Sequence, residues 1–244
     1  MNHTGVEQLS ITGAPAINGL AARMLPVDQS RFTNMTDTQK YVMTVFAQLL
    51  HRDPTAAEFS LWTKRIDKRI VSRLIMAHQL ANTIEAHTLQ VQAWYSQYLG
   101  RPATAKELFL PVRQLASGQP DSLVLSQILA GGEFAKRVKV LVPGAAANDQ
   151  FVIGLYKLSI DPLATPTASE LLRLTTMVRR LGRAAAARDI LNSARFRSNR
   201  AEALSAQILN KPADAQAKLD SQREIRASNL KAILLSRISF VTPR

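Results

Sequence analysis

The four histidines are the first candidates for metal or acid–base chemistry. They are His3, His51, His78 and His87. A zinc site needs ligands at positions i and i+4, or at a comparably convergent spacing, together with thiolates or carboxylates. His78 and His87 are nine residues apart, and the chain contains no cysteine. We therefore predict no metal site, and nothing in the sequence indicates a cofactor.

The acidic residues are the next candidates, because paired carboxylates carry out acid–base and glycosidic chemistry. Glu58, Glu107 and Glu170 share the same early position in three predicted helices, three residues after a threonine. A negative charge is favoured there by the helix macrodipole. We interpret these glutamates as structural helix-end acids and predict no catalytic residue and no enzymatic activity. An enzyme would instead need a deep pocket lined by acids from different parts of the chain.

A run of arginines between positions 173 and 200 is the strongest candidate for binding chemistry. The planar guanidinium group forms bidentate hydrogen bonds with carboxylates and phosphates. The chain has 31 Lys and Arg residues against 18 Asp and Glu, a formal net charge of +13. We predict a partner-binding basic surface made of Arg173, Arg179, Arg180, Arg183, Arg188, Arg195, Arg197 and Arg200.

The excess of positive charge favours acidic protein surfaces or polyanions as partners. The arginines do not all share one helical face: Arg173 and Arg180 lie together, while Arg179 and Arg183 lie more to the side. No recognisable nucleic-acid motif with base-stacking aromatic residues accompanies them. We expect protein subunits with acidic surfaces as the partners and keep nucleic acid as the alternative.

A short phrase that recurs four times indicates the elements that must position these residues. Each copy ends an apolar helical stretch, forms a turn, and precedes a residue that can cap a second helix. The copies cover residues 49–54, 98–103, 159–163 and 208–213. The capping residues are Thr55, Thr104, Thr167 and Asp214. Apolar residues three and four positions apart precede each turn, as on one face of a helix.

The sequence therefore predicts an all-α fold of four related helical units, arranged as two pairs behind an extended N-terminal arm. The small-residue-rich segment at 143–149 contains Pro143-Gly144 and suggests a boundary. We predict an extended or flexible arm over 1–36, a first pair of units over 37–142, a linker over 143–149 and a second pair over 150–244. No apolar run of about 18 residues is present, so no transmembrane segment is expected.

Residues 91–134 contain three phrases that resemble a known family. They are Trp94-Tyr95-Ser96-Gln97-Tyr98-Leu99-Gly100-Arg101-Pro102, Leu115-Ala116-Ser117-Gly118 and Ile128-Leu129-Ala130-Gly131-Gly132-Glu133-Phe134. This stretch resembles the domain of unknown function 4214 family, a small helical module that is similar to the phycobilisome linker domain. The resemblance implies an all-α fold, no known catalytic residue, and a setting in bacterial surface, secreted or assembly proteins.

Arrays of similar units more often bind partners or form part of a larger structure than catalyse reactions. Together with the net charge, the recurring phrase leads to a functional hypothesis. The chain is expected to be a non-enzymatic structural or linker subunit of a larger bacterial assembly that binds protein neighbours through basic helical surfaces. The alternative is a basic helical protein that associates with nucleic acid.

Overall fold

The computed structural model describes residues 32–223 and 227–240, and within these residues the chain is all α-helical, as predicted. Most of the predicted N-terminal arm, residues 1–31, lies outside the described residues. Phe32 is buried, and its ring centroid lies 6.4 Å from that of Phe240 near the other end of the described chain. No helix in the described ranges is long and apolar enough to cross a membrane.

Thirteen α-helices and one five-residue π-helical segment make up the described part of the chain. The first half contains α1 (Asp37–Leu50), α2 (Ala56–Asp67), α3 (Arg73–Ala81), α4 (Ile84–Trp94), the π-helical η2 (Tyr95–Leu99), α5 (Ala105–Ala116) and α6 (Asp121–Leu129). The second half contains α7 (Gly132–Leu141), α8 (Ala147–Ser159), α9 (Ala168–Leu181), α10 (Arg183–Leu191), α11 (Ala194–Leu209), α12 (Ala215–Arg223) and α13 (Ala227–Ser236).

The helices that follow the recurring turns, α2, α5, α9 and α12, begin as the sequence predicts. Each of α2, α5 and α9 starts with a capping box, in which a threonine side chain accepts the backbone N–H of a glutamate that in turn accepts the threonine N–H. In α12, the carboxylate of Asp214 accepts the N–H of Ala217 at 2.7 Å. Two backbone donors are satisfied at each capping box. The prediction that Glu58, Glu107 and Glu170 are helix-end acids is confirmed.

Three of the four recurring turns use a residue in the left-handed conformation. These residues are His51 (φ 53°), Gly100 (φ 75°) and Asn210 (φ 52°), which end α1, η2 and α11. Glycine and asparagine are the usual residues at such helix ends. The third turn differs, because Ile160 after α8 has a φ of −110°.

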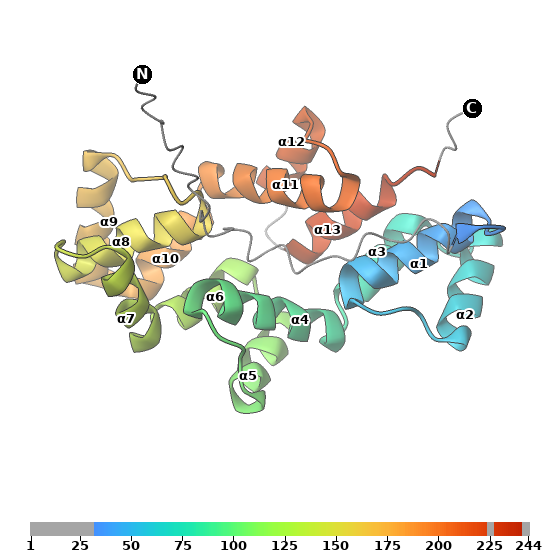
Figure 1. Cartoon of the computed structure of the whole chain (residues 1–244), viewed down its shortest axis with the longest axis horizontal. Coiled ribbons are helices and arrows are strands. Elements are labelled where there is room, and N and C mark those ends of the chain that lie inside the picture. The colour runs from blue at the N-terminus through green and yellow to red at the C-terminus, as the bar shows by residue number, and fades with distance from the viewer. Residues whose placement is uncertain (1–31, 224–226, 241–244) are drawn as a thin grey trace, which may run out of the picture.

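Helices far apart in the sequence pack together and give the molecule its shape. α13 packs extensively against α3, and α10 packs against α6. Figure 1 shows α1–α3 at one end of an elongated body, α7–α10 at the other end, and α4–α6 and α11–α13 between them. Through the contact between α3 and α13, the last described helix therefore packs against one of the first.

The predicted linker at 143–149 covers the connection between α7 and α8 and the first residues of α8. A single hydrophobic cluster continues across it, from Phe134 and Val138 of α7 to Phe151 and Leu155 of α8. The rings of Phe134 and Phe151 meet edge to face with centroids 5.6 Å apart. The core does not divide at the predicted boundary, because α7 and α8 bury their apolar sides against each other.

A second hydrophobic cluster shows where the core does divide. It joins the apolar sides of α1 and α3 to Ala232 and Leu235 of α13. Residues of α6, α7, α8 and α10 belong to the first cluster instead. The first cluster therefore covers η2 and α6–α10, and the second joins α1–α3 to α13. Two smaller clusters lie at α4–α6 and at α11–α13.

Candidate functional site

The predicted basic residues occupy three helices and differ in what their guanidinium groups contact. Their positions are Arg173, Arg179 and Arg180 on α9, Arg183 and Arg188 on α10, and Arg195, Arg197 and Arg200 on α11. Five of the eight residues are exposed and three are half-buried. Some members support the fold, and others leave their charge at the surface.

The half-buried arginines of this set make contacts within the fold. The guanidinium carbon of Arg183 lies 5.7 Å from the ring centroid of Phe151, a cation–π contact. Nη1 of Arg197 donates to the carbonyl oxygen of Gln222 at 2.6 Å and so connects α11 to α12. Arg200 lines a cavity that is partly open to solvent. These three residues therefore contribute contacts within the fold as well as charge.

The exposed members are Arg173, Arg179, Arg180, Arg188 and Arg195. Arg173 donates to Asp189 of α10 at 2.7 Å, which neutralises its charge locally. Arg179 donates to the hydroxyl group of Thr176 one turn earlier, at 3.1 Å. Within the described ranges, no carboxylate forms an ion pair with Arg179, Arg180 or Arg188. These three side chains leave a concentrated positive charge on α9 and α10.

Helix α9 has one buried side and one exposed side. Leu174, Thr175 and Val178 are buried against the rest of the fold. The exposed side, which we call the α9 outer face, consists of Leu172, Arg173, Arg179 and Arg180, together with the exposed Leu181 at the C-terminal end of the helix.

The two leucines of the α9 outer face are 66% and 70% exposed. They were not singled out from the sequence. Leu172 lies two positions before the buried Leu174, so it is out of phase with the buried side of the helix. That offset is the signal that could have identified it.

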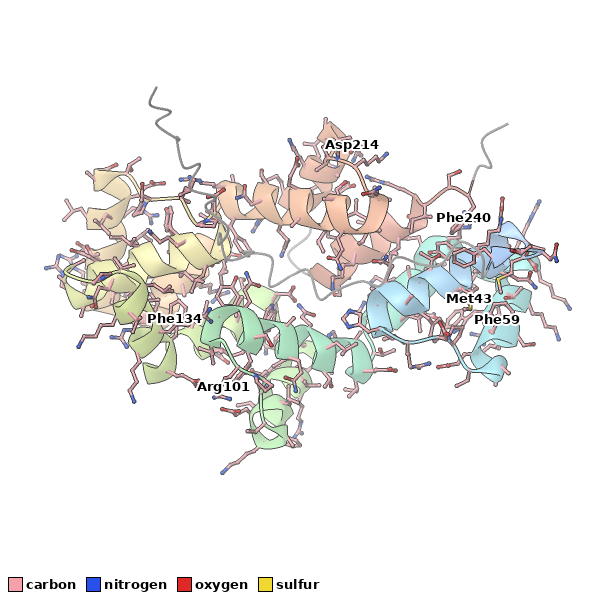
Figure 2. All side chains as sticks on the ribbon, viewed as in Figure 1. Met43, Phe59, Arg101, Phe134, Asp214 and Phe240 are labelled. Atoms are coloured by element: carbon pink, nitrogen blue, oxygen red, sulfur yellow. The ribbon has the colours of Figure 1, made fainter. Side chains whose placement is uncertain are left out.

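Arg101, in the second recurring turn, forms a closed structural joint. Its Nε and Nη2 atoms donate to Glu133 at 2.5 and 2.6 Å, and Nη1 and Nη2 donate to Glu107 at 3.0 and 2.6 Å. Nη1 also donates to the carbonyl oxygen of Pro102 at 3.0 Å. All five N–H donors of the guanidinium are therefore used. Figure 2 shows Arg101 where α5 begins, and its two carboxylate partners connect α5 to α7.

Arg52 forms the same joint 49 positions earlier in the chain. It binds Glu58 of α2 at 2.9 Å through both terminal nitrogens and Glu85 of α4 at 2.7 and 3.0 Å, and it donates to the carbonyl oxygen of Asp53 at 3.1 Å. The Arg52 guanidinium lowers the pKa of Glu58 to about 2. Sequence analysis placed an arginine in this turn but did not identify its partners. Because every donor is occupied, the joint is structural and offers no open site.

The third turn has Pro162 in place of the arginine, and Arg195 takes over part of its role. Arg195 comes from the beginning of α11, and its guanidinium carbon lies 5.9 Å from the ring centroid of Tyr156. Hydrogen bonds from Thr167 are the main cause of the lowered pKa of Glu170, and the charge of Arg195 adds to it. Although Arg195 is exposed, these contacts give it a role in the fold.

The comparisons with known proteins provide no assignment of this site. Within the described ranges, no three His, Asp or Glu side chains converge closely enough to hold a metal ion. No protein-family model, curated protein or solved structure matches this chain.

Proposed function

We propose that this chain is a non-enzymatic structural or linker subunit that binds an acidic surface of a protein partner through the α9 outer face. One observation supports the proposal above the others. Two largely exposed leucines flank arginines on a helix whose other side is buried, and Arg179 and Arg180 have no acidic partner among the described residues. Such a face combines apolar contact with bidentate recognition of carboxylates.

A protein partner explains the leucines better than nucleic acid does. Protein interfaces bury apolar side chains at their centre and are enriched in arginine. Phosphate binding needs the arginines alone, and readers of single-stranded RNA add aromatic residues on which bases stack. The α9 outer face has no aromatic residue. Nucleic acid remains the alternative because the chain carries a net charge of +13.

The resemblance of residues 91–134 to a module that occurs in bacterial surface, secreted and assembly proteins supports the setting that we propose. In this setting the occupied joints at Arg52 and Arg101 fix the directions of α2 and α5, and the exposed arginines of α9 remain for a partner. Some arginines thus hold the helices in place while others bind the partner. A rigid frame of this kind lowers the entropy that is lost on binding.

Site-specific photo-crosslinking in the source cells tests the proposal. A photoreactive amino acid is placed at Leu172 or Leu181 of α9, and at Leu110 of α5, which is 59% exposed and serves as the matched control. The proposal predicts one defined protein adduct from both α9 positions and none from position 110. Adducts of equal yield from all three positions, or none from α9, contradict it.

The nucleic-acid alternative is tested with the purified chain. Fluorescence anisotropy is measured with a mixed-sequence DNA duplex and a single-stranded RNA over a range of salt concentrations. The alternative predicts tight binding that weakens steeply with salt, because phosphate contacts release counterions. Our proposal predicts only weak binding, reduced equally by charge reversal on α9 and on α5.

A further inference from the structure

A cavity of about 290 Å³ lies among helices from the middle and the end of the described chain. Its walls come from α4, η2, α6, α8, α10, α11 and α13. Trp94, Leu125, Ile160 and Phe196 supply apolar surface to these walls. The volume is close to the lower limit of roughly 300 Å³ for small-molecule sites, and an apolar lining with a few polar groups is typical of them.

Lys231 of α13 is the most unusual residue in the wall. Burial lowers the pKa of Lys231, and the negative charge of Asp121 only partly opposes this effect. Within the described ranges, no carboxylate forms an ion pair with the Lys231 ammonium group. Lys231 is half-buried and lines the cavity, so its positive charge can meet a ligand there.

Two further cations and two acids line the same cavity. Lys157 and Arg200 add positive charge. The acids already have structural roles: Asp121 accepts a hydrogen bond from Gln90 Nε2 at 3.0 Å, and Asp161 accepts the N–H of Leu163 at 2.7 Å. The cavity therefore presents cations to a ligand and lacks a poised pair of acids.

The π-helical segment η2 forms part of the wall and supplies Gln97 and Tyr98. Gln97 is held on both sides, because its Nε2 donates to the carbonyl oxygen of Leu158 at 2.9 Å and its own carbonyl oxygen accepts Nη1 of Arg137 at 2.8 Å. π-Helical turns are rare and occur frequently at functional sites. This one supplies two residues to the wall of the cavity.

We propose that the cavity binds a small organic carboxylate, with its charge against Lys231 and its apolar body against Trp94 and Phe196. The three cations of the lining outnumber its two acids, which favours a negatively charged ligand, and the apolar walls match a hydrocarbon or aromatic body. Inorganic phosphate lacks that body. The walls come from helices that are far apart in the sequence, among them α4, α8, α11 and α13. A bound ligand therefore stabilises the packing of these helices against one another. This site is separate from the α9 outer face.

Binding is tested on the full chain by calorimetry and thermal unfolding. Benzoate and hexanoate are compared with the neutral benzyl alcohol and hexanol, and with inorganic phosphate. We expect both carboxylates to bind at millimolar or lower concentration and to raise the unfolding temperature. This comparison needs only the wild-type chain. The proposal is overturned if the neutral compounds or phosphate bind as tightly as the carboxylates, or if neither carboxylate binds.

The position of the charge is tested with Lys231→Met and the matched control Lys139→Met, which removes an exposed lysine of α7. Loss of a charge-assisted contact weakens benzoate binding by about tenfold or more. We expect this loss in Lys231→Met and unchanged binding in Lys139→Met. Wild-type affinity in Lys231→Met contradicts the assignment. Lys231→Gln serves as a second variant that retains polarity without charge, and it is expected to bind benzoate as weakly as Lys231→Met.

Discussion

Arg195 lies over the ring of Tyr156, with its guanidinium carbon 5.9 Å from the ring centroid. Arg101 lies over Tyr95 in the same way, at 5.4 Å, although it comes from the turn that follows the aromatic helix. Arg101 is the main cause of the lowered pKa of Glu107, whereas the pKa of Glu170 is lowered mainly by hydrogen bonds from Thr167, to which the charge of Arg195 adds. Both places therefore combine an aromatic ring, a guanidinium group and a capping carboxylate. The arginine comes from the turn itself in one case and from the beginning of α11 in the other.

The joint at Arg101 is expected to be sensitive even to lysine. Arg101→Lys keeps the charge but has three donors on a point charge, so it cannot bind two carboxylates bidentately. We predict a lower midpoint in urea unfolding for Arg101→Lys, with the slope of the transition unchanged. Arg173→Lys is the control, because Arg173 forms a single exposed ion pair of the kind that contributes about 0–1 kcal/mol. An equal effect of the two substitutions contradicts the prediction.

The same joints predict a specific loss of stability in acid. The pKa values of Glu58 and Glu107 are lowered from 4.5 to about 2, first by their arginine partners. A lowered pKa in the folded state gives stability that is complete above the unfolded value and is lost as the pH falls. We expect the free energy of unfolding to decline between about pH 4.5 and pH 2. Urea unfolding at a series of pH values measures this decline.

The variant with both Arg52→Met and Arg101→Met is the control for the acid experiment. Its glutamates no longer have arginine partners, so their pKa values are expected to lie closer to the unfolded value. We predict a shallower decline of stability over the same pH range. A decline as steep as that of the wild type shows that other groups are responsible.

The contact between α7 and α8 depends on Gly154. A Cβ atom at this position would overlap with the buried side chain of Val138. We predict that Gly154→Ala lowers the free energy of unfolding by about 1–3 kcal/mol, as overpacking of a core does. Gly132→Ala is the control, because a Cβ atom there meets nothing within 4 Å. Chemical denaturation measures both variants, and equal stabilities contradict the close packing of α7 on α8.

Lys231 is expected to lower the stability of the ligand-free chain. Replacing the half-buried Lys231 with methionine removes a partly buried charge and retains most of the side-chain volume. We predict that Lys231→Met raises the free energy of unfolding by about 1 kcal/mol. Lys139→Met is expected to change it by less than about 0.5 kcal/mol. A destabilised Lys231→Met variant would show that the ammonium group supports the fold.

Local features of the fold could be predicted from the sequence. The capping residues Thr55, Thr104 and Thr167 are confirmed, because a capping box depends on residues three positions apart. The contacts between α3 and α13 and across 143–149 could not be predicted. They depend on which apolar sides meet across long separations, and a Pro-Gly turn indicates only that the chain bends there.

The candidate sites were predictable to a smaller extent. The arginines of α9 were identified by composition, but composition does not distinguish the exposed Arg180 from the half-buried Arg183 or Arg197. The cavity was not anticipated, because Lys231 and Trp94 lie far apart in the chain and come to line one cavity only through the tertiary packing of several helices. Lysine in an amphipathic helix ordinarily indicates a solvent-exposed face.

The central claim concerns the α9 outer face, and charge reversal tests it most directly. The variant with Arg179→Glu and Arg180→Glu is compared with a variant carrying Lys106→Glu and Arg113→Glu on α5, which has the same change in net charge. All four positions are exposed, so both variants are expected to retain wild-type stability within about 0.5 kcal/mol.

The decisive measurement is size-exclusion chromatography of the tagged chain, isolated from its source cells at low ionic strength, with identification of the proteins that co-elute. We predict that the wild type and the α5 variant elute in a complex with the same acidic protein, and that the α9 variant elutes alone. If the α9 variant retains that partner, or if the wild type elutes without any protein partner, the account of the α9 outer face is contradicted.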